Sequence, residues 1–356
     1  MRLMLRSLCT LVVLAAVGSP AASAQAAAPA AQAPLALAER IPFDSVVRTG
    51  TLPNGLRYFI RQNGRPANRM TLRLAVKTGS LYEADDQQGL AHLIEHMAFN
   101  GSAHFKPGEL VSYFETVGAR LGPHVNAYTS FDETVYMLDL PTDSKEVVQK
   151  GLQAMADFAG GLSLTDEEIN KERGVVIEEW RGRLGAGSRV NDQQVPVLYY
   201  KSRYADRTPI GKPEIIRNAP TQRLRDFYNT WYRPERMALI VVGDAKPEDL
   251  EAVVRAEFGP LKDRAPKATE PDHTVPLHKD DLVSIVTDAE VTSSSVRILR
   301  KRPAENDVLV GDYRRSLVAT LFGHMFNDRF TELARRPDAK FLGAGDRKST
   351  RLNSSH

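Results

Sequence analysis

Two stretches of alternating apolar and polar residues lead into one strongly apolar helix. Residues 70–76 alternate with the large apolar side chains on one side, and residues 56–60 alternate after a Pro-Asn-Gly turn, so both stretches predict strands. An acidic start at residues 85–87 and an Asn100-Gly101 ending bound the helix that follows. The first part of the chain therefore predicts two strands followed by a helix.

The middle of the chain continues these patterns. Helical spacing of apolar residues predicts helices at residues 110–117, 147–162, 165–180, 224–232 and 247–258. Residues 126–140 predict two strands joined by a turn, and the compact apolar run at residues 237–244 predicts a buried strand. Residues 181–222 are rich in Gly, Pro and Arg, and residues 185–188 within them predict a loop.

A new set of patterns begins after a proline-rich linker at residues 263–276. Residues 282–287 and 293–300 predict a pair of strands, and residues from about 307 to 336 predict a helix. His324 in this helix has no acidic partner at ligand spacing, which favours a structural role. We therefore expect part of a second domain from residue 277 onward.

Composition agrees with a soluble protein of more than one domain. The chain has 356 residues, of which 42% are hydrophobic and 26% are charged. Its 47 basic and 44 acidic residues are interspersed, and the formal net charge is +3. This balance gives no indication of a nucleic-acid partner.

The first 24 residues have the layout of a secretory signal peptide, with two arginines, an apolar run and an Ala22-Ser23-Ala24 ending. The apolar run is too short to span a bilayer comfortably, so we expect no stable membrane anchor. An Ala/Pro-rich leader follows at residues 25–40. The single cysteine, Cys9, lies in the signal segment, so the exported chain has no disulfide chemistry. These features predict export across the inner membrane to the periplasm.

The clearest chemical signal is His92-x-x-Glu95-His96. On a helix the two histidines fall roughly 40° apart, with Glu95 roughly 60° to the other side of His92, so all three share one face. Two imidazoles one turn apart can hold zinc, and the carboxylate can take a proton from a metal-bound water. The alternative is a helix with two surface histidines and a solvated glutamate. This order of residues is the inverted zinc-peptidase signature.

With its surroundings, the stretch at residues 89–102 resembles the pitrilysin family, which includes insulin-degrading enzymes, mitochondrial processing peptidases and bacterial periplasmic zinc proteases. The resemblance runs from about residue 45 to about residue 345. It implies an α+β fold at residues 41–262, a two-layer LuxS/metallopeptidase-like α/β domain with a mixed, mainly antiparallel sheet. It also implies that residues 277–345 are the N-terminal part of a second, non-catalytic domain of the same type.

The resemblance implies a further pair of site residues. Glu172 and Glu179 lie roughly 20° apart on one helix face but two turns apart, so one zinc cannot bind both directly. In the family, the second glutamate of such a pair is the third zinc ligand and the first is an outer-shell residue, which gives Glu179 and Glu172 these roles. The spacing from His96 is slightly longer than in archetypal members, which leaves Glu178 as an alternative ligand. Without the upstream histidines, this helix would indicate only a solvated face.

The stretch at Asn126, Ala127 and Tyr128 resembles the exposed strand edge that pairs with the substrate backbone in the family. An ordinary hairpin is the alternative.

Full-length members have four related domains in two halves, and the distal half contributes an Arg/Tyr pair near the zinc. We therefore expect this chain to be an N-terminal fragment whose partner is the C-terminal half of the same polypeptide. Residues 346–356 resemble sequencing-adapter read-through, so we expect a non-native tail.

Taken with the motif, the resemblance implies a zinc-dependent metalloendopeptidase acting on peptides or unfolded polypeptides. One zinc per chain would activate a water, and Glu95 would be the general base. Two alternatives remain, a catalytically silent subunit of the family and a metal-binding scaffold protein.

Overall fold

The structure is a computed structural model that describes residues 35–303 and 305–347. These residues form two compact units, one of residues 42–303 and one of residues 35–41 together with 305–347. The predicted signal peptide and most of the predicted leader and tail lie outside the described residues. Within the described ranges, no helix combines the length and the apolar character needed to cross a membrane.

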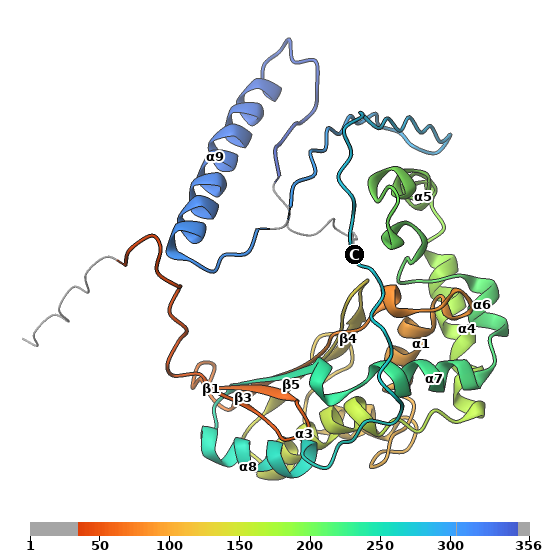
Figure 1. Cartoon of the computed structure of the whole chain (residues 1–356), viewed down its shortest axis with the longest axis vertical. Helices are drawn as coiled ribbons and strands as arrows, with labels where there is room; N and C mark the ends of the chain where they lie inside the picture. Colours follow the sequence, from red (N-terminus) through yellow and green to blue (C-terminus); the bar gives the residue numbers. More distant parts are fainter. Residues whose placement is uncertain (1–34, 304, 348–356) are drawn as a thin grey trace, which may run out of the picture. The chain divides into compact units, whose positions relative to one another are not determined.

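A six-stranded sheet forms the centre of the larger unit (Figure 1). Its strands in spatial order are β1 (Arg48–Thr51), β2 (Arg57–Gln62), β6 (Met237–Gly243), β3 (Arg69–Val76), β5 (Thr134–Pro141) and β4 (Val125–Thr129). β2 and β6 pair in parallel, and the other neighbouring pairs are antiparallel. The predicted α+β fold with a mixed, mainly antiparallel sheet is therefore confirmed.

One face of this sheet is buried under helices and the other is half-exposed. Every second residue of β3 is buried, and the register places Leu72 opposite Leu138 on β5 and Val241 on β6. Because side chains alternate along a strand, these three residues share one face. Gly151 lies in helix α3 (Lys145–Gly160), which packs on this face. A Cβ atom at this position would lie 2.3 Å from Leu140 Cδ1 and 3.1 Å from Leu72 Cδ1. Glycine thus permits close packing of helix on sheet, in two layers.

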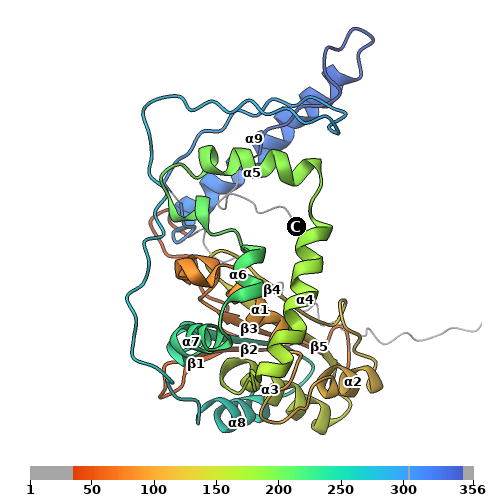
Figure 2. The ribbon, with the colours of Figure 1, turned by 90° about the vertical axis from the view of Figure 1, so that its right-hand side faces the viewer.

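Eight α-helices are described in the larger unit. They are α1 (Leu90–Met97), α2 (Glu109–Thr116), α3 (Lys145–Gly160), α4 (Asp166–Gly182), α5 (Ala186–Leu198), α6 (Pro213–Asn218), α7 (Thr221–Trp231) and α8 (Pro247–Phe258). The Thr165 side chain accepts from the Glu168 amide and so caps the N-terminus of α4. Figure 2 shows α4 standing beside α1, and this neighbourhood builds the site described below.

Three local expectations were wrong. α1 begins at Leu90 rather than at residues 85–87, because Gly89 has a φ of 101° and separates α1 from a short 3-10 turn at Asp85–Gln87. Residues 186–188 are helical and start α5 instead of forming a loop. Residues 282–287 and 293–300 form no strands, since among the described residues no strand pairs with their backbone. Alternation alone does not form a sheet without a hydrogen-bonding partner.

The smaller unit contains the long helix α9 (Val310–Ala334), which confirms the helix predicted near residues 307–336. A short antiparallel bridge joins Arg40 to Leu309 just before this helix. The backbone amide of Val310 donates to the carbonyl of Glu39 at 2.8 Å, which ties the segment at residues 35–41 to the start of α9.

Candidate metal centre

Helix α1 places His92 and His96 side by side. Their ring centroids are 4.7 Å apart and the rings are nearly perpendicular, at 86°. The helix is anchored by Leu93, Ile94 and Met97, which are fully buried. His92 is buried, and the His96 side chain is 21% exposed. The apolar residues thus fix the helix in the core while the imidazoles remain available from one side.

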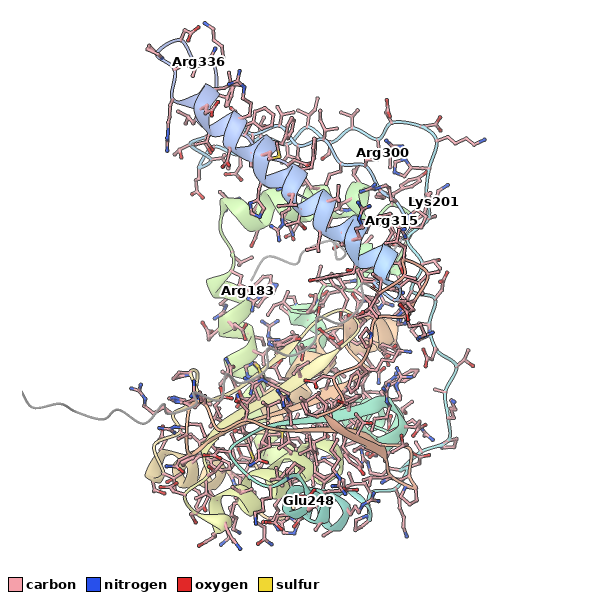
Figure 3. The ribbon with its side chains drawn as sticks, turned by 90° about the vertical axis from the view of Figure 1, so that its left-hand side faces the viewer. Arg183, Lys201, Glu248, Arg300, Arg315 and Arg336 are labelled. Atoms are coloured by element: carbon pink, nitrogen blue, oxygen red, sulfur yellow. The ribbon has the colours of Figure 1, made fainter. Side chains whose placement is uncertain are left out.

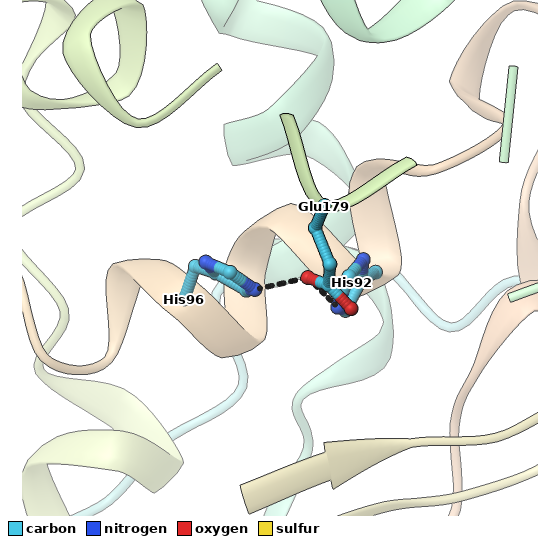
Figure 4. A group of neighbouring side chains, drawn as sticks. All are labelled: His92, His96 and Glu179. Atoms are coloured by element: carbon cyan, nitrogen blue, oxygen red, sulfur yellow. Dashed lines mark ion pairs between the residues drawn. The ribbon is translucent and has the colours of Figure 1, made fainter. Parts of the chain in front are cut away.

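Glu179 of α4 reaches both histidines, and Figure 4 shows its carboxylate beside their rings. Its Oε2 atom lies 3.5 Å from His92 Nε2 and 3.3 Å from His96 Nε2. One possible ligand atom from each residue falls within 4.8 Å of the others. Two imidazoles and one carboxylate form a donor set that catalytic zinc sites use, with a further position left open. The residues present therefore fit a zinc ion.

The neighbouring Glu178 does not join this group. Its side chain is 67% exposed, and its Oε1 accepts from Arg181 at 2.5 Å. The two adjacent glutamates point in different directions because successive helical residues are about 100° apart. The structure therefore brings Glu179, rather than Glu178, to the histidines.

Glu172 contacts His96 on the other side of its ring. Glu172 Oε1 lies 2.9 Å from His96 Nδ1, and Glu172 Oε2 accepts from the Asn100 side chain. A carboxylate that accepts from Nδ1 leaves the lone pair of Nε2 for a metal and fixes the ring orientation. His92 Nδ1, in contrast, is buried without a hydrogen-bond partner among the described residues.

Burial and close charges control the protonation of the ligand group. Burial and the nearby His96 lower the pKa of His92 to about 4, so this imidazole is neutral. Burial also lowers the pKa of His96, but hydrogen bonds to Glu172 and Glu179 outweigh it and raise this pKa to about 9. The hydrogen bond with His96 holds the pKa of Glu179 at about 2. A bound cation would replace the proton on His96 Nε2, the nitrogen that faces Glu179.

Glu95 lies on the same helix, α1, and its side chain is held by a residue of strand β4. Its Oε2 accepts from Thr129 Oγ1 at 2.7 Å. Burial raises the pKa of Glu95, although the Thr129 hydrogen bond opposes the shift. A raised carboxyl pKa brings proton uptake closer to neutral pH, which suits a general base.

The residues expected to contact substrate lie on the edge strand β4. This strand pairs with β5 on one side and ends the sheet. Asn126 is exposed, whereas Ala127 and Tyr128 are half-buried. Thr129, the next residue, contacts Glu95, so the C-terminal end of β4 lies directly beside the candidate metal site.

Two residues that the sequence analysis missed also contact the site or the helix that carries it. Glu83 is fully buried, and its Oε1 accepts from the amides of Gly89 at 2.9 Å and Ala91 at 2.8 Å, which holds the start of α1. Arg183, at the end of α4 in Figure 3, donates to Glu179 Oε1. The Glu179–Arg183 pair has a helical i,i+4 spacing that a sequence can reveal. The Glu83 contact has no such periodic signal.

Comparisons with known proteins agree with this fold. Residues 58–191 match the family described as Insulinase (Peptidase family M16), and residues 218–335 match the Peptidase M16 inactive domain. The chain is 35% identical over 294 residues to the zinc protease PQQL-like of Arabidopsis thaliana, covering 82% of this chain and 31% of that protein. It is 32% identical over 321 residues to the probable zinc protease PqqL of Escherichia coli strain K12, covering 89% and 34%.

A solved structure extends the comparison. The first half of the periplasmic protease PqqL from Escherichia coli matches with a TM-score of 0.72 at 30% identity, covering 87% of this chain and 66% of that one. The fold is therefore that of the domains in this half of PqqL. The chain belongs to peptidase family M16, the pitrilysin family, which confirms the resemblance seen in the sequence. It spans about a third of the length of the curated relatives it matches.

Proposed function

We propose that this chain carries the catalytic domain of a zinc metalloendopeptidase that hydrolyses peptides or unfolded polypeptides. The observation that carries the proposal is the convergence of His92, His96 and Glu179 beside the buried carboxylate of Glu95. Relatives that are named zinc proteases support the same activity.

The side chains divide the proposed chemistry between them. His92, His96 and Glu179 would hold one zinc ion, which when bound polarises a carbonyl group and makes water more acidic. Glu95 takes a proton from the attacking water and returns it to the leaving amine. Burial helps this exchange because it raises the pKa of Glu95 and so makes the carboxylate a better proton acceptor.

The edge of β4 would bind the substrate. An extended peptide can add a strand to an open sheet edge through main-chain hydrogen bonds, which depend little on side-chain identity. Asn126, Ala127 and Tyr128 would therefore position many different sequences, in agreement with a peptidase of unfolded chains.

The intact protein would need a partner half and an export step. We propose that a C-terminal half of the same polypeptide encloses the substrate. This chain alone would then bind zinc but cleave peptides slowly, because catalysis depends on accurate positioning.

We also propose periplasmic action after removal of residues 1–24. N-terminal sequencing of periplasmic material should begin at Gln25, and a cytoplasmic protein beginning at Met1 would contradict export.

Zinc content and peptide hydrolysis test the proposal separately. The purified chain should hold about one zinc, and Glu179→Gln should lose it while the matched variant Glu178→Gln keeps it. Glu95→Gln should retain zinc but hydrolyse an unstructured fluorogenic peptide slower by orders of magnitude. Turnover unaffected by Glu95→Gln would remove Glu95 from the mechanism and favour a metal-binding scaffold.

A further inference from the structure

A hydroxyl group from the edge strand touches the proposed general base. Thr129 is the last residue of β4, and its Oγ1 donates to Glu95 Oε2 at 2.7 Å. Thr129 is 7% exposed and Glu95 is 8% exposed. Because water has little access, this hydrogen bond to a carboxylate keeps most of its strength.

The surrounding hydroxyls determine where the Thr129 proton points. Thr134 Oγ1 donates to the backbone carbonyl of Thr78 at 3.0 Å, and a carbonyl cannot donate in return. Thr134 can therefore only accept from Thr129, and that separation is 3.5 Å. The Glu95 oxygen is nearer and carries the charge, so the single hydroxyl proton of Thr129 is directed to Glu95.

We propose that Thr129 is a positioning residue that holds the carboxylate of Glu95 in its working orientation and links it to the substrate-binding edge of β4. This inference rests on the proposed role of Glu95 as the general base. The hydrogen bond engages Oε2, so Oε1 is the oxygen presented to the attacking water. A peptide paired with β4 and the base that acts on it would then be joined through one residue.

The experiment compares variants that differ in one hydroxyl. Thr129→Val keeps the shape of the side chain and removes the donor, whereas Thr129→Ser keeps the donor. Thr78→Val is the matched control, because Thr78 Oγ1 is buried without a hydrogen-bond partner among the described residues. Each variant is prepared as the full chain, and its zinc content, melting temperature, kcat and KM are measured on an unstructured fluorogenic peptide.

Thr129→Val should lower kcat by about 10- to 100-fold with full zinc content and with KM changed by less than about twofold. Thr129→Ser should restore most of kcat, and Thr78→Val should match the parent chain. If Thr129→Val loses zinc, Thr129→Ala replaces it as the variant without a donor. Parental kcat in the variant that lacks the hydroxyl and keeps its zinc would overturn the inference.

A second measurement does not depend on turnover. In protein labelled with carboxyl-13C glutamate, the Glu95 resonance is the one that disappears in Glu95→Gln. It should shift in Thr129→Val and stay in place in Thr129→Ser and Thr78→Val. An unshifted resonance would also overturn the inference. Loss of hydrolysis in Glu95→Gln but not in Thr129→Val would contradict the positioning role alone, whereas full hydrolysis in Glu95→Gln would contradict the proposed function itself.

Discussion

Glu172 lies 2.9 Å from Nδ1 of His96, on the side of the ring opposite to the nitrogen that faces Glu179. The two glutamates belong to the same helix, α4, and are two turns apart. One helix thus supplies both the carboxylate proposed as a metal ligand and the carboxylate that contacts the other side of the ring. Asn100 restrains Glu172 in turn, so the ring orientation is set by a short chain of hydrogen bonds.

Removing the orienting carboxylate should weaken metal binding. Glu172→Ala should lower zinc affinity by about 10- to 100-fold, measured by competition with a chelator, because His96 loses the partner that fixes its tautomer and angle. Glu178→Ala on the same helix is the control, since Glu178 is exposed and pairs only with Arg181 among the described residues. Equal affinities in both variants would mean that Glu172 does not support the site.

Glu83 should stabilise α1, the helix that carries the proposed metal ligands His92 and His96. Glu83→Ala leaves the buried amides of Gly89 and Ala91 without their acceptor, which should lower the free energy of unfolding by about 1–3 kcal/mol. Chemical denaturation of the zinc-free chain measures this loss. Glu83→Gln keeps a carbonyl oxygen for the amides and should lose less, so a glutamine variant as unstable as the alanine variant would contradict this role.

The same residue should give the stability a distinctive pH dependence. Burial raises the pKa of Glu83 from 4.5 to about 8, so between these values the folded chain holds a proton that the unfolded chain releases. This contribution to the free energy of unfolding is therefore complete below pH 4.5 and is lost as the pH rises to about 8. Glu83→Gln has no titrating group and should show a flatter profile over this range. A profile identical to that of the parent would exclude Glu83 as its source.

Arg183 should weaken zinc binding in the parent chain. Its guanidinium pairs with Glu179 and places a positive charge beside the ligand group. Arg183→Gln should raise zinc affinity by about two- to fivefold, a modest change because the Arg183 side chain is largely exposed. Arg181→Gln, which removes an equal charge two residues earlier that pairs with Glu178, should have a smaller effect. A weaker affinity in Arg183→Gln would show that Arg183 instead helps to position Glu179.

Away from the site, Glu251 should stabilise the contact of α8 with β2 at neutral pH. The Tyr58 hydroxyl donates to Glu251 at 2.6 Å, and with Arg255 and Arg48 it lowers the pKa of Glu251 to about 2. Glu251→Gln should lower the free energy of unfolding by about 1–3 kcal/mol near pH 7. Since the folded pKa lies below the unfolded value of 4.5, the difference should shrink as the pH falls from 4.5 toward 2. A loss that is unchanged at low pH would show that packing, not charge, is responsible.

Much of the architecture follows from local patterns. Period-two alternation predicted the strand at residues 70–76, and the helix at Pro247–Phe258 has the expected bounds because its apolar spacing and proline start are local signals. The strands expected at residues 282–287 and 293–300 failed because a strand also needs a partner, which periodicity does not provide.

The candidate site divides in the same way. The sequence by itself determined that His92, Glu95 and His96 share a helix face and that Glu172 and Glu179 share another, since both follow from the helical period. Only the tertiary structure decided that α4 lies against α1 so that Glu179 meets the histidines, and that Thr129 and Glu83 hold Glu95 and the start of α1. These contacts join residues from separate elements, and their geometry depends on how the whole core packs.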